Sequence, residues 1–209
     1  MPAPDLATLV ATGHTALILQ EVQQGVMGDE SALPALADAA RRSGATANIA
    51  RLAAAARTAA IPVIHCTAET LAGGFGANHN ARLFGGVRRG GTTPTSASAP
   101  VPEVGPAPGD LIMPRYHGLS PLTGTQLDSV LRNEGITTVV VVGVSLNVAI
   151  PNLVFDAVNR AYQVVLVTDA VAGVPDGYGP QIIENTLSLV STLATTDGVI
   201  AAWGSTQAP

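Results

Sequence analysis

The sequence predicts a single α/β domain in which a parallel β-sheet is covered by helices. The chain has 209 residues, enough to bury one sizeable hydrophobic core. Apolar residues make up 47% of the chain but aromatic residues only 3%, so the core has to be built from Val, Leu, Ile and Ala, as in buried parallel strands. Apolar strand-like runs also alternate with helical stretches, which is the pattern of βαβ units.

Two strands and a broken helix are predicted in the first third of the chain. The first strand ends at polar residues that include Glu21, which therefore lies at a strand carboxyl end. The long alanine-rich helical stretch is interrupted near Ser43-Gly44. The elements expected here are a strand over Thr15–Leu19 that runs into Gln20–Gln23, a helix over Leu33–Ala60 with Asn48–Ala59 as its stronger part, and a strand over Pro62–Cys66.

Residues 72–109 are rich in Gly, Pro, Ser and Thr and are too polar and too interrupted for a continuous helix or strand. Loops of this length are uncommon inside compact domains, and they usually serve as lids, subunit contacts or disordered connections. We therefore expect a flexible loop at about 72–109, acting as a lid or an interface arm, within a single domain that spans residues 1–209.

The second half of the chain alternates strands and helices at the spacing of parallel βαβ units. Its most apolar strand, Val139–Val142, is predicted to lie at the centre of the sheet. The other elements expected are a short strand over Asp110–Met113, a helix over Thr123–Asn133, a helix over Asn147–Ala161, a strand over Gln163–Val167, a helix over Gly179–Leu193, and a last edge strand within Thr195–Ala202.

The functional residues of a parallel sheet gather at the carboxyl ends of its strands. With the strands assigned above, Glu21, His65, Arg115 and the turn at Val144-Ser145 all lie at that edge. The sequence therefore predicts a site there.

Charge and cysteine content exclude several classes of protein. The net charge is −5, all basic residues are arginine and there is no basic run, which argues against nucleic acid or an anionic membrane as the main partner. No secretory leader is visible over Met1–His14, and no apolar stretch reaches the ~18 residues needed to span a bilayer. We expect a soluble cytoplasmic protein that binds a small molecule. Cys66, the single cysteine, is interpreted as a packed residue rather than a catalytic thiol.

Three spaced segments carry a resemblance to a known family. They are Gln20–Gln23, Gly109–Arg115 together with Ser120–Leu127, and Gly143–Ile150. These segments resemble, in the same order, the motifs Ile-Asp-Met-Gln, Gly-Asp-strand-Lys with Ser-Ala-Phe-x-Gly-Thr-x-Leu, and Gly-Val-x-Thr-x-x-Cys-Val of the isochorismatase-like superfamily, also called the cysteine hydrolases. The resemblance runs from about Thr15 to Val199.

The resemblance implies which residues stand at the catalytic positions of the family. Glu21 takes the place of the catalytic aspartate, Arg115 that of the catalytic lysine, and Ala149 that of the nucleophilic cysteine. Glutamate and arginine keep the signs of the charges that they replace, so an ion pair is expected between them. Alanine carries only a methyl group and cannot form a thioester. The chain is therefore identified as a divergent member that lacks the catalytic cysteine.

Further features of the fold and the site follow from the same resemblance. The sheet is expected to have the strand order 3-2-1-4-5-6 within three α/β/α layers. A non-proline cis peptide is expected between Val144 and Ser145, where it would aim backbone N–H groups into an oxyanion hole. Together with Val148, His117 and Cys66, these two residues are expected to line the ligand site. The Asp-x-His metal motif of nicotinamidases is not matched after the second strand, so we predict no metal and no cofactor. The relatives also imply a homodimer or homotetramer.

Two functions stay open at this point. In the first, the chain is a hydrolase without a thiol nucleophile, and Glu21 is a general acid that protonates an enol ether before water completes the cleavage. That role requires Glu21 to hold its proton near neutral pH, which Arg115 beside it opposes. In the second, the chain is a catalytically inactive relative, a pseudoenzyme, that binds a small polar ligand or acts as an assembly subunit.

A third hypothesis treats Cys66 as a relocated nucleophile, with His65 or His117 as its base. Adjacent residues of a strand point to opposite faces of the sheet. His65 and Cys66 are therefore not expected to face one pocket together.

Overall fold

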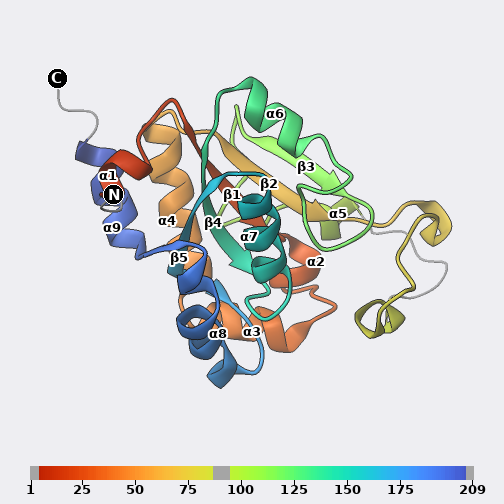
Figure 1. Cartoon of the computed structure of the whole chain (residues 1–209). Coiled ribbons are helices and arrows are strands. Elements are labelled where there is room, and N and C mark those ends of the chain that lie inside the picture. The colour runs from red at the N-terminus through yellow and green to blue at the C-terminus, as the bar shows by residue number, and fades with distance from the viewer. Residues whose placement is uncertain (1–4, 87–94, 206–209) are drawn as a thin grey trace.

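The chain folds around one parallel six-stranded sheet with the strand order β3-β2-β1-β4-β5-β6 (Figure 1). The computed structural model describes residues 5–86 and 95–205. The strand order expected from the family resemblance is confirmed. The strands are β1 (Thr15–Gln20), β2 (Val63–Ala68), β3 (Leu111–Arg115), β4 (Thr138–Val144), β5 (Gln163–Ala172) and β6 (Thr192–Ala194).

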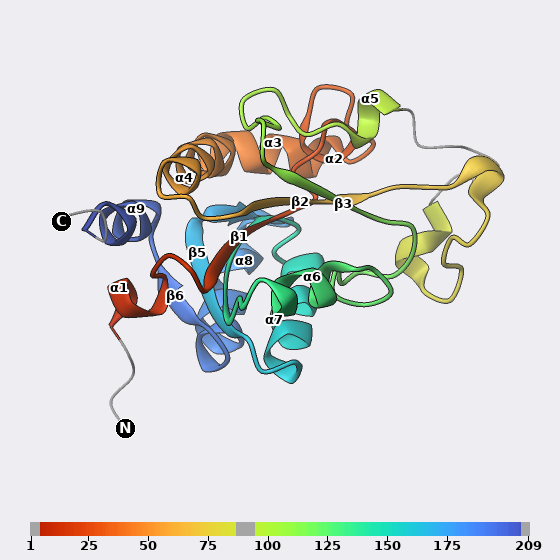
Figure 2. The same ribbon diagram turned by 90° about the horizontal axis from the view of Figure 1, so that it is seen from above.

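Helices cover both faces of the sheet (Figure 2). The α-helices are α1 (Leu6–Leu9), α2 (Gln24–Met27), α3 (Pro34–Arg42), α4 (Ala45–Thr58), α5 (Thr95–Ser98), α6 (Leu127–Asn133), α7 (Ala149–Asn159), α8 (Gly179–Asn185) and α9 (Thr196–Ser205). Short 3₁₀-helices lie over Ala72–Gly74, Arg82–Gly86, Asp176–Tyr178 and Leu187–Leu189. Within the described residues, no helix has the length and apolar character needed to cross a bilayer.

Two hydrophobic cores form because successive residues of each strand point to opposite faces of the sheet. Leu17 and Leu19 of β1 pack in the core shared with α3, α4 and α9. Ala16 and Ile18 of the same strand pack in the core shared with α6, α7 and α8. Both faces of β1 are thus buried, which explains why this strand reads as a continuous apolar run.

The long helical stretch is broken where the sequence predicted a break. Helix α3 ends at Arg42, and Gly44 has φ +77° at the start of α4. Glycine adopts this left-handed conformation without the penalty that a side chain brings. The break lets α3 and α4 lie at different angles along one face of the sheet (Figure 2).

The end of the chain differs from the prediction. An edge strand was expected within Thr195–Ala202, but these residues lie in or beside α9, and the edge strand β6 precedes them. Asp169 accepts hydrogen bonds from the backbone N–H and the hydroxyl of Thr196, which fixes the start of the helix. Trp203 is buried, and its indole N–H donates to the Val10 carbonyl. A short apolar run suits either element, and here tertiary contacts selected the helix.

The segment over residues 72–109 is only partly separate from the domain. Its first part runs away from the body of the protein (Figure 1), whereas Val101 and Val104 are buried in the core beside α4. Pro100 forms a β-bridge with Gln23. Residues 87–94, which belong to the predicted loop, lie outside the described residues.

Candidate active site

Glu21 and Arg115 form an ion pair at the carboxyl edge of the sheet. Glu21 directly follows β1, and Arg115 is the last residue of β3, two strands away. Nη2 of Arg115 donates a hydrogen bond to Oε1 of Glu21 at 2.7 Å. The Arg115 side chain is 5% exposed and that of Glu21 14%, so the pair is largely shielded from solvent. Glu21 has φ +54°, a strained value for a residue with a side chain.

Gln20 joins the ion pair from the last position of β1. Its Nε2 group donates to Oε1 of Glu21 at 2.9 Å and to the Leu119 carbonyl at 3.5 Å. Nε of Arg115 donates to the Gly118 carbonyl at 3.1 Å. Two buried polar atoms of this cluster, Oε1 of Gln20 and Nη1 of Arg115, have no hydrogen-bond partner among the described residues. Such atoms are uncommon in protein interiors and suit contacts with a bound ligand or water.

The turn that leads to Ala149 follows the neighbouring strand β4. The peptide bond between Val144 and Ser145 is cis, and the Ser145 carbonyl accepts hydrogen bonds from the N–H groups of Val148 and Ile150. Ala149 is the first residue of α7 and is 3% exposed. Because β1 and β4 are paired, with Gln20 opposite Gly143, this turn and Glu21 leave the sheet side by side.

Cys66 and His65 point into different surroundings. Cys66 is 1% exposed and lies in the core with α6 and α7. Burial raises the pKa of its thiol to about 12, although the positive charge of Arg115 acts in the opposite direction. The sequence predicted His65 at the carboxyl end of the second strand, but His65 lies inside β2. Its Nε2 atom is hydrogen-bonded to Asp110. A buried, protonated thiol whose neighbouring imidazole is bonded elsewhere does not suit the role of a nucleophile.

His117 lies in the loop between β3 and α6 and is exposed. Its ring rests over Gly124, where an added Cβ atom would come within 2.4 Å of the imidazole. The structure thus places His117 in the loop that also carries Gly118 and Leu119, two residues whose carbonyls contact the ion-pair cluster.

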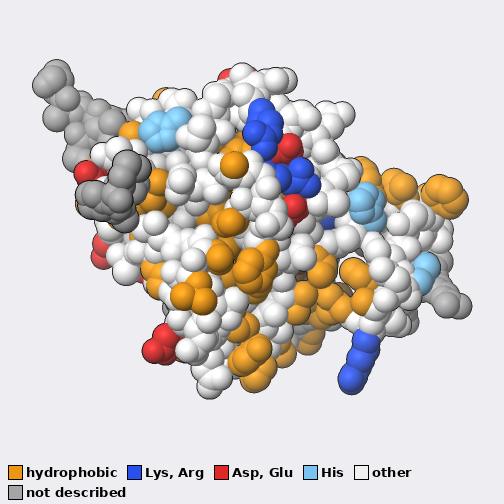
Figure 3. All heavy atoms as spheres, in the orientation of Figure 1, with side chains coloured by type: hydrophobic (Ala, Val, Ile, Leu, Met, Phe, Trp, Pro, Cys, Tyr) orange, Lys and Arg blue, Asp and Glu red, His pale blue; other side chains and the backbone are white. Residues whose placement is uncertain are grey.

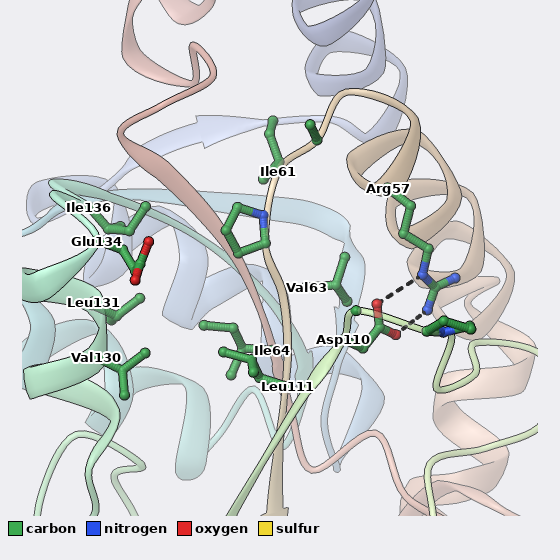
Figure 4. Close-up of a pocket in the computed structure, with 14 residues that line it drawn as sticks. Arg57, Ile61, Val63, Ile64, Asp110, Leu111, Val130, Leu131, Glu134 and Ile136 are labelled. Carbon is green, nitrogen blue, oxygen red and sulfur yellow. Dashed lines mark hydrogen bonds and ion pairs between the residues drawn. The ribbon is translucent and has the colours of Figure 1, made fainter.

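A cavity of about 590 Å³ lies at the opposite end of the strands (Figure 4). Its floor is apolar and includes Val63, Ile64 and Leu111. Arg57 and Asp110 stand on one wall, and Glu134 stands on the other (Figure 4). A second cavity, of about 360 Å³, lies between α3, the end of β5 and α8. Neither cavity is lined by Glu21, Arg115 or Ala149.

Apolar side chains also gather on the face around α7 and α8 (Figure 3). Phe155 and Val158, three residues apart on α7, are 42% and 37% exposed there. On a helix this spacing places both side chains on one face. The outer surface of the helix that begins at Ala149 therefore carries two apolar side chains beside the exposed Asn152 and Asn159.

Arg57, Asp110 and His65 form a buried polar network beside the larger cavity. Asp110, 3% exposed, accepts from Arg57 at 2.6 Å and from the Ala107 N–H at 2.9 Å, and lies 2.9 Å from Nε2 of His65. Burial lowers the pKa of His65, so the imidazole is neutral at pH 7. Burial would raise the pKa of Asp110, but the hydrogen bonds outweigh it and lower that pKa to about 2.

Asp110→Asn is expected to lower the free energy of unfolding by about 2 kcal/mol at pH 7. The folded-state pKa of Asp110, about 2, lies below its ordinary value of 3.8, so the ionised carboxylate stabilises the fold above that ordinary value. This contribution disappears as the pH falls through about 2. Urea titrations should therefore show the two proteins converging in acid. Asp29→Asn, at a side chain that is 100% exposed, is the control, and an equal loss there would contradict the assignment.

The sequence did not reveal two parts of this arrangement. Gln20 belongs to the motif over Gln20–Gln23, but nothing in that motif indicates that its amide donates to Glu21. The Arg57–Asp110 contact joins residues that are 53 positions apart, and no local pattern predicts it. A polar residue at the end of a fully buried strand was the one signal that could have singled out Gln20.

A parallel sheet in this strand order, with helices on both faces, defines a doubly wound α/β protein, and its Glu21–Arg115 ion pair lies at the carboxyl edge, where such proteins bind their ligands. The family is then given by comparison with known proteins. Residues 15–197 match the model of the Isochorismatase domain, and the chain belongs to this family of isochorismatase-like hydrolases.

Several relatives are known by name. The ureidoacrylate amidohydrolase RutB of Methylobacterium radiotolerans is 36% identical over 140 residues, which are 59% of this chain and 53% of that protein. RutB of Pseudomonas syringae pv. syringae is 30% identical over 188 residues, 81% of this chain and 75% of that protein. The chain thus spans about half of the first relative's length and three quarters of the second's.

Solved structures show the same fold. A cysteine hydrolase from Pseudomonas syringae pv. phaseolicola superposes with a TM-score of 0.79 at 25% identity, covering 99% of this chain and 100% of that one. An isochorismatase family protein from Burkholderia thailandensis superposes with a TM-score of 0.75 at 24% identity, covering 92% of this chain and 97% of that one.

Proposed function

We propose that this protein is a hydrolase that works without a thiol nucleophile and that Glu21 donates the proton to the substrate. The observation that carries this proposal is the shielded Glu21–Arg115 pair at the carboxyl edge, which is next to a turn whose helix begins with Ala149. A methyl group supplies no nucleophile, so water has to be the group that attacks. Oε1 of Glu21 is held by two donors, and no described residue donates to Oε2.

An enol ether is the substrate class that fits these residues. Glu21, in its protonated form, would give the Oε2 proton to the terminal vinyl carbon, and the ether carbon would become an oxocarbenium ion. Water adds to that carbon and loses a proton, which returns to the carboxylate. The hemiketal then breaks into a ketone and an alcohol. The sum is substrate plus one water, and no covalent enzyme intermediate is needed.

A second candidate is ligand binding without turnover, and one observation favours it. Arg115 and Gln20 both donate to Oε1 of Glu21, which suits an ionised carboxylate and opposes proton donation. Small polar molecules that offer an acceptor to Nη1 of Arg115, a buried donor with no partner in residues 5–86 and 95–205, would be ligands of such a site. The ureidoacrylate named in the relatives is one compound to include in a binding screen.

The assay that separates the two candidates measures ketone release from isochorismate and simpler enol ethers. For the hydrolase, we expect turnover by the wild type and a loss of at least ~100-fold in kcat for Glu21→Gln. Glu30→Gln, at an exposed glutamate, is the matched control and should keep its activity. No turnover, combined with a ligand-induced rise in Tm that Glu21→Gln abolishes, would instead support the binding protein. Rapid amide hydrolysis by the wild type would contradict both.

A further inference from the structure

The side chain of Gln20 is held in one orientation at the centre of the site. Gln20 is 0% exposed, and its backbone is paired with Cys66 on one side and Gly143 on the other. The two hydrogen-bond partners of its amide nitrogen, Oε1 of Glu21 and the Leu119 carbonyl, are both acceptors. Only the NH2 end of the amide is able to satisfy them, so the amide oxygen has to point away.

Gln20 and Arg115 hold the carboxylate of Glu21 in the same way. Each donates to Oε1 of Glu21, at 2.9 Å and 2.7 Å respectively, and each also donates to a carbonyl of the loop after β3. The loop carbonyls are those of Leu119 and Gly118. The carboxylate is therefore bound to the loop by two parallel bridges that share one oxygen, and the other oxygen is left without a donor from the described residues.

Gln20 does not improve the packing of the core. Its amide oxygen is buried and has no hydrogen-bond partner in the part of the chain that the structure describes, and such a group destabilises the folded state. An apolar side chain of the same length would remove this unpartnered oxygen, but it would also lose the bonds to Glu21 and Leu119. Residues that cost stability in this way are typical of functional sites.

We infer that Gln20 is a positioning residue. It keeps Oε1 of Glu21 hydrogen-bonded within the protein and leaves Oε2 as the oxygen that contacts the ligand. This role extends the proposed function, because it rests on Glu21 as the proton-transfer group. Gln20 itself does not touch the reacting atoms. It acts by fixing the rotation of the carboxylate, so its loss should affect the chemical step more than the affinity for substrate.

Gln20→Met tests this role, because methionine keeps the length and shape of glutamine but has no amide. Thr15→Val is the matched control: Thr15 is also in β1 and 0% exposed, its hydroxyl also has no partner, and it lies at the other end of the strand. Thr15→Val should keep or raise the Tm, whereas Gln20→Met also loses the bonds donated to Glu21 and Leu119, so its Tm should fall modestly while the protein stays folded. With an enol ether substrate, Gln20→Met should lower kcat by at least ~10-fold with KM within about twofold, and Thr15→Val should match the wild type. An unchanged kcat in Gln20→Met would overturn the inference.

A second readout does not depend on turnover, so it separates this inference from the proposed function. The side-chain carboxyl carbon of Glu21 is observed by NMR in selectively ¹³C-labelled protein. Thr15→Val should leave its resonance in place, and Gln20→Met should shift or broaden it, even if the wild type hydrolyses nothing. The same resonance position and width in Gln20→Met as in the wild type would show that Gln20 does not position Glu21.

Discussion

Replacing Gly143 with alanine is expected to lower the free energy of unfolding by more than about 4 kcal/mol, or to prevent folding altogether. A Cβ atom at this position would lie 2.2 Å from the Gln20 carbonyl oxygen and 2.9 Å from the Gln20 nitrogen. Both are backbone atoms of the neighbouring central strand, so neither is able to move aside without breaking the β1–β4 ladder. Gly143 also has φ +111°, which disfavours any side chain.

Gly13→Ala is the control for this prediction. Gly13 has φ +86°, but an added Cβ would meet no atom within 4 Å. It should therefore show only the conformational penalty, about 1–2 kcal/mol. Urea unfolding followed by the fluorescence of Trp203, the single tryptophan, measures both variants. Equal losses in the two variants would show that the close approach of β1 and β4 is not what requires glycine.

Arg115→Met is expected to destabilise the protein by about 3 kcal/mol, at the lower end of the range for breaking a buried ion pair. The substitution leaves the carboxylate of Glu21, 14% exposed, without its charged partner, and the Gly118 carbonyl loses its donor. Arg41→Met serves as the surface control. Arg41 is 47% exposed and pairs with exposed aspartates, so its loss should cost less than about 0.5 kcal/mol.

A double variant identifies the cause of the Arg115→Met effect. Adding Glu21→Gln removes the uncompensated charge, so the pair of substitutions should cost less than the sum of the two single ones. The free energy of unfolding at pH 7 is the quantity to compare. Strict additivity would mean that the two charges do not interact, and the ion pair would then have no energetic role.

Most strands of the sheet could be predicted from the sequence, because strands such as β1 and β4 are buried on both faces and therefore form long apolar runs in the sequence. It was misleading at α9, where a short apolar run is decided by the Asp169–Thr196 bonds and by the packing of Trp203. The contact between Glu21 and Arg115 was expected from the motifs. The donation by Gln20 was not, since it depends on a side-chain rotation that only the folded surroundings fix.

The guanidinium at position 115 has a consequence for how the ion pair is able to respond to pH. Lysine is able to lose its proton when it is buried, but arginine stays positively charged in proteins. Arg115 therefore supplies a constant cation, and of the two paired residues only Glu21 is able to exchange a proton with a ligand or with solvent. A ligand at this pair would meet a fixed cationic donor in Arg115 and, in Glu21, a partner whose charge is able to change.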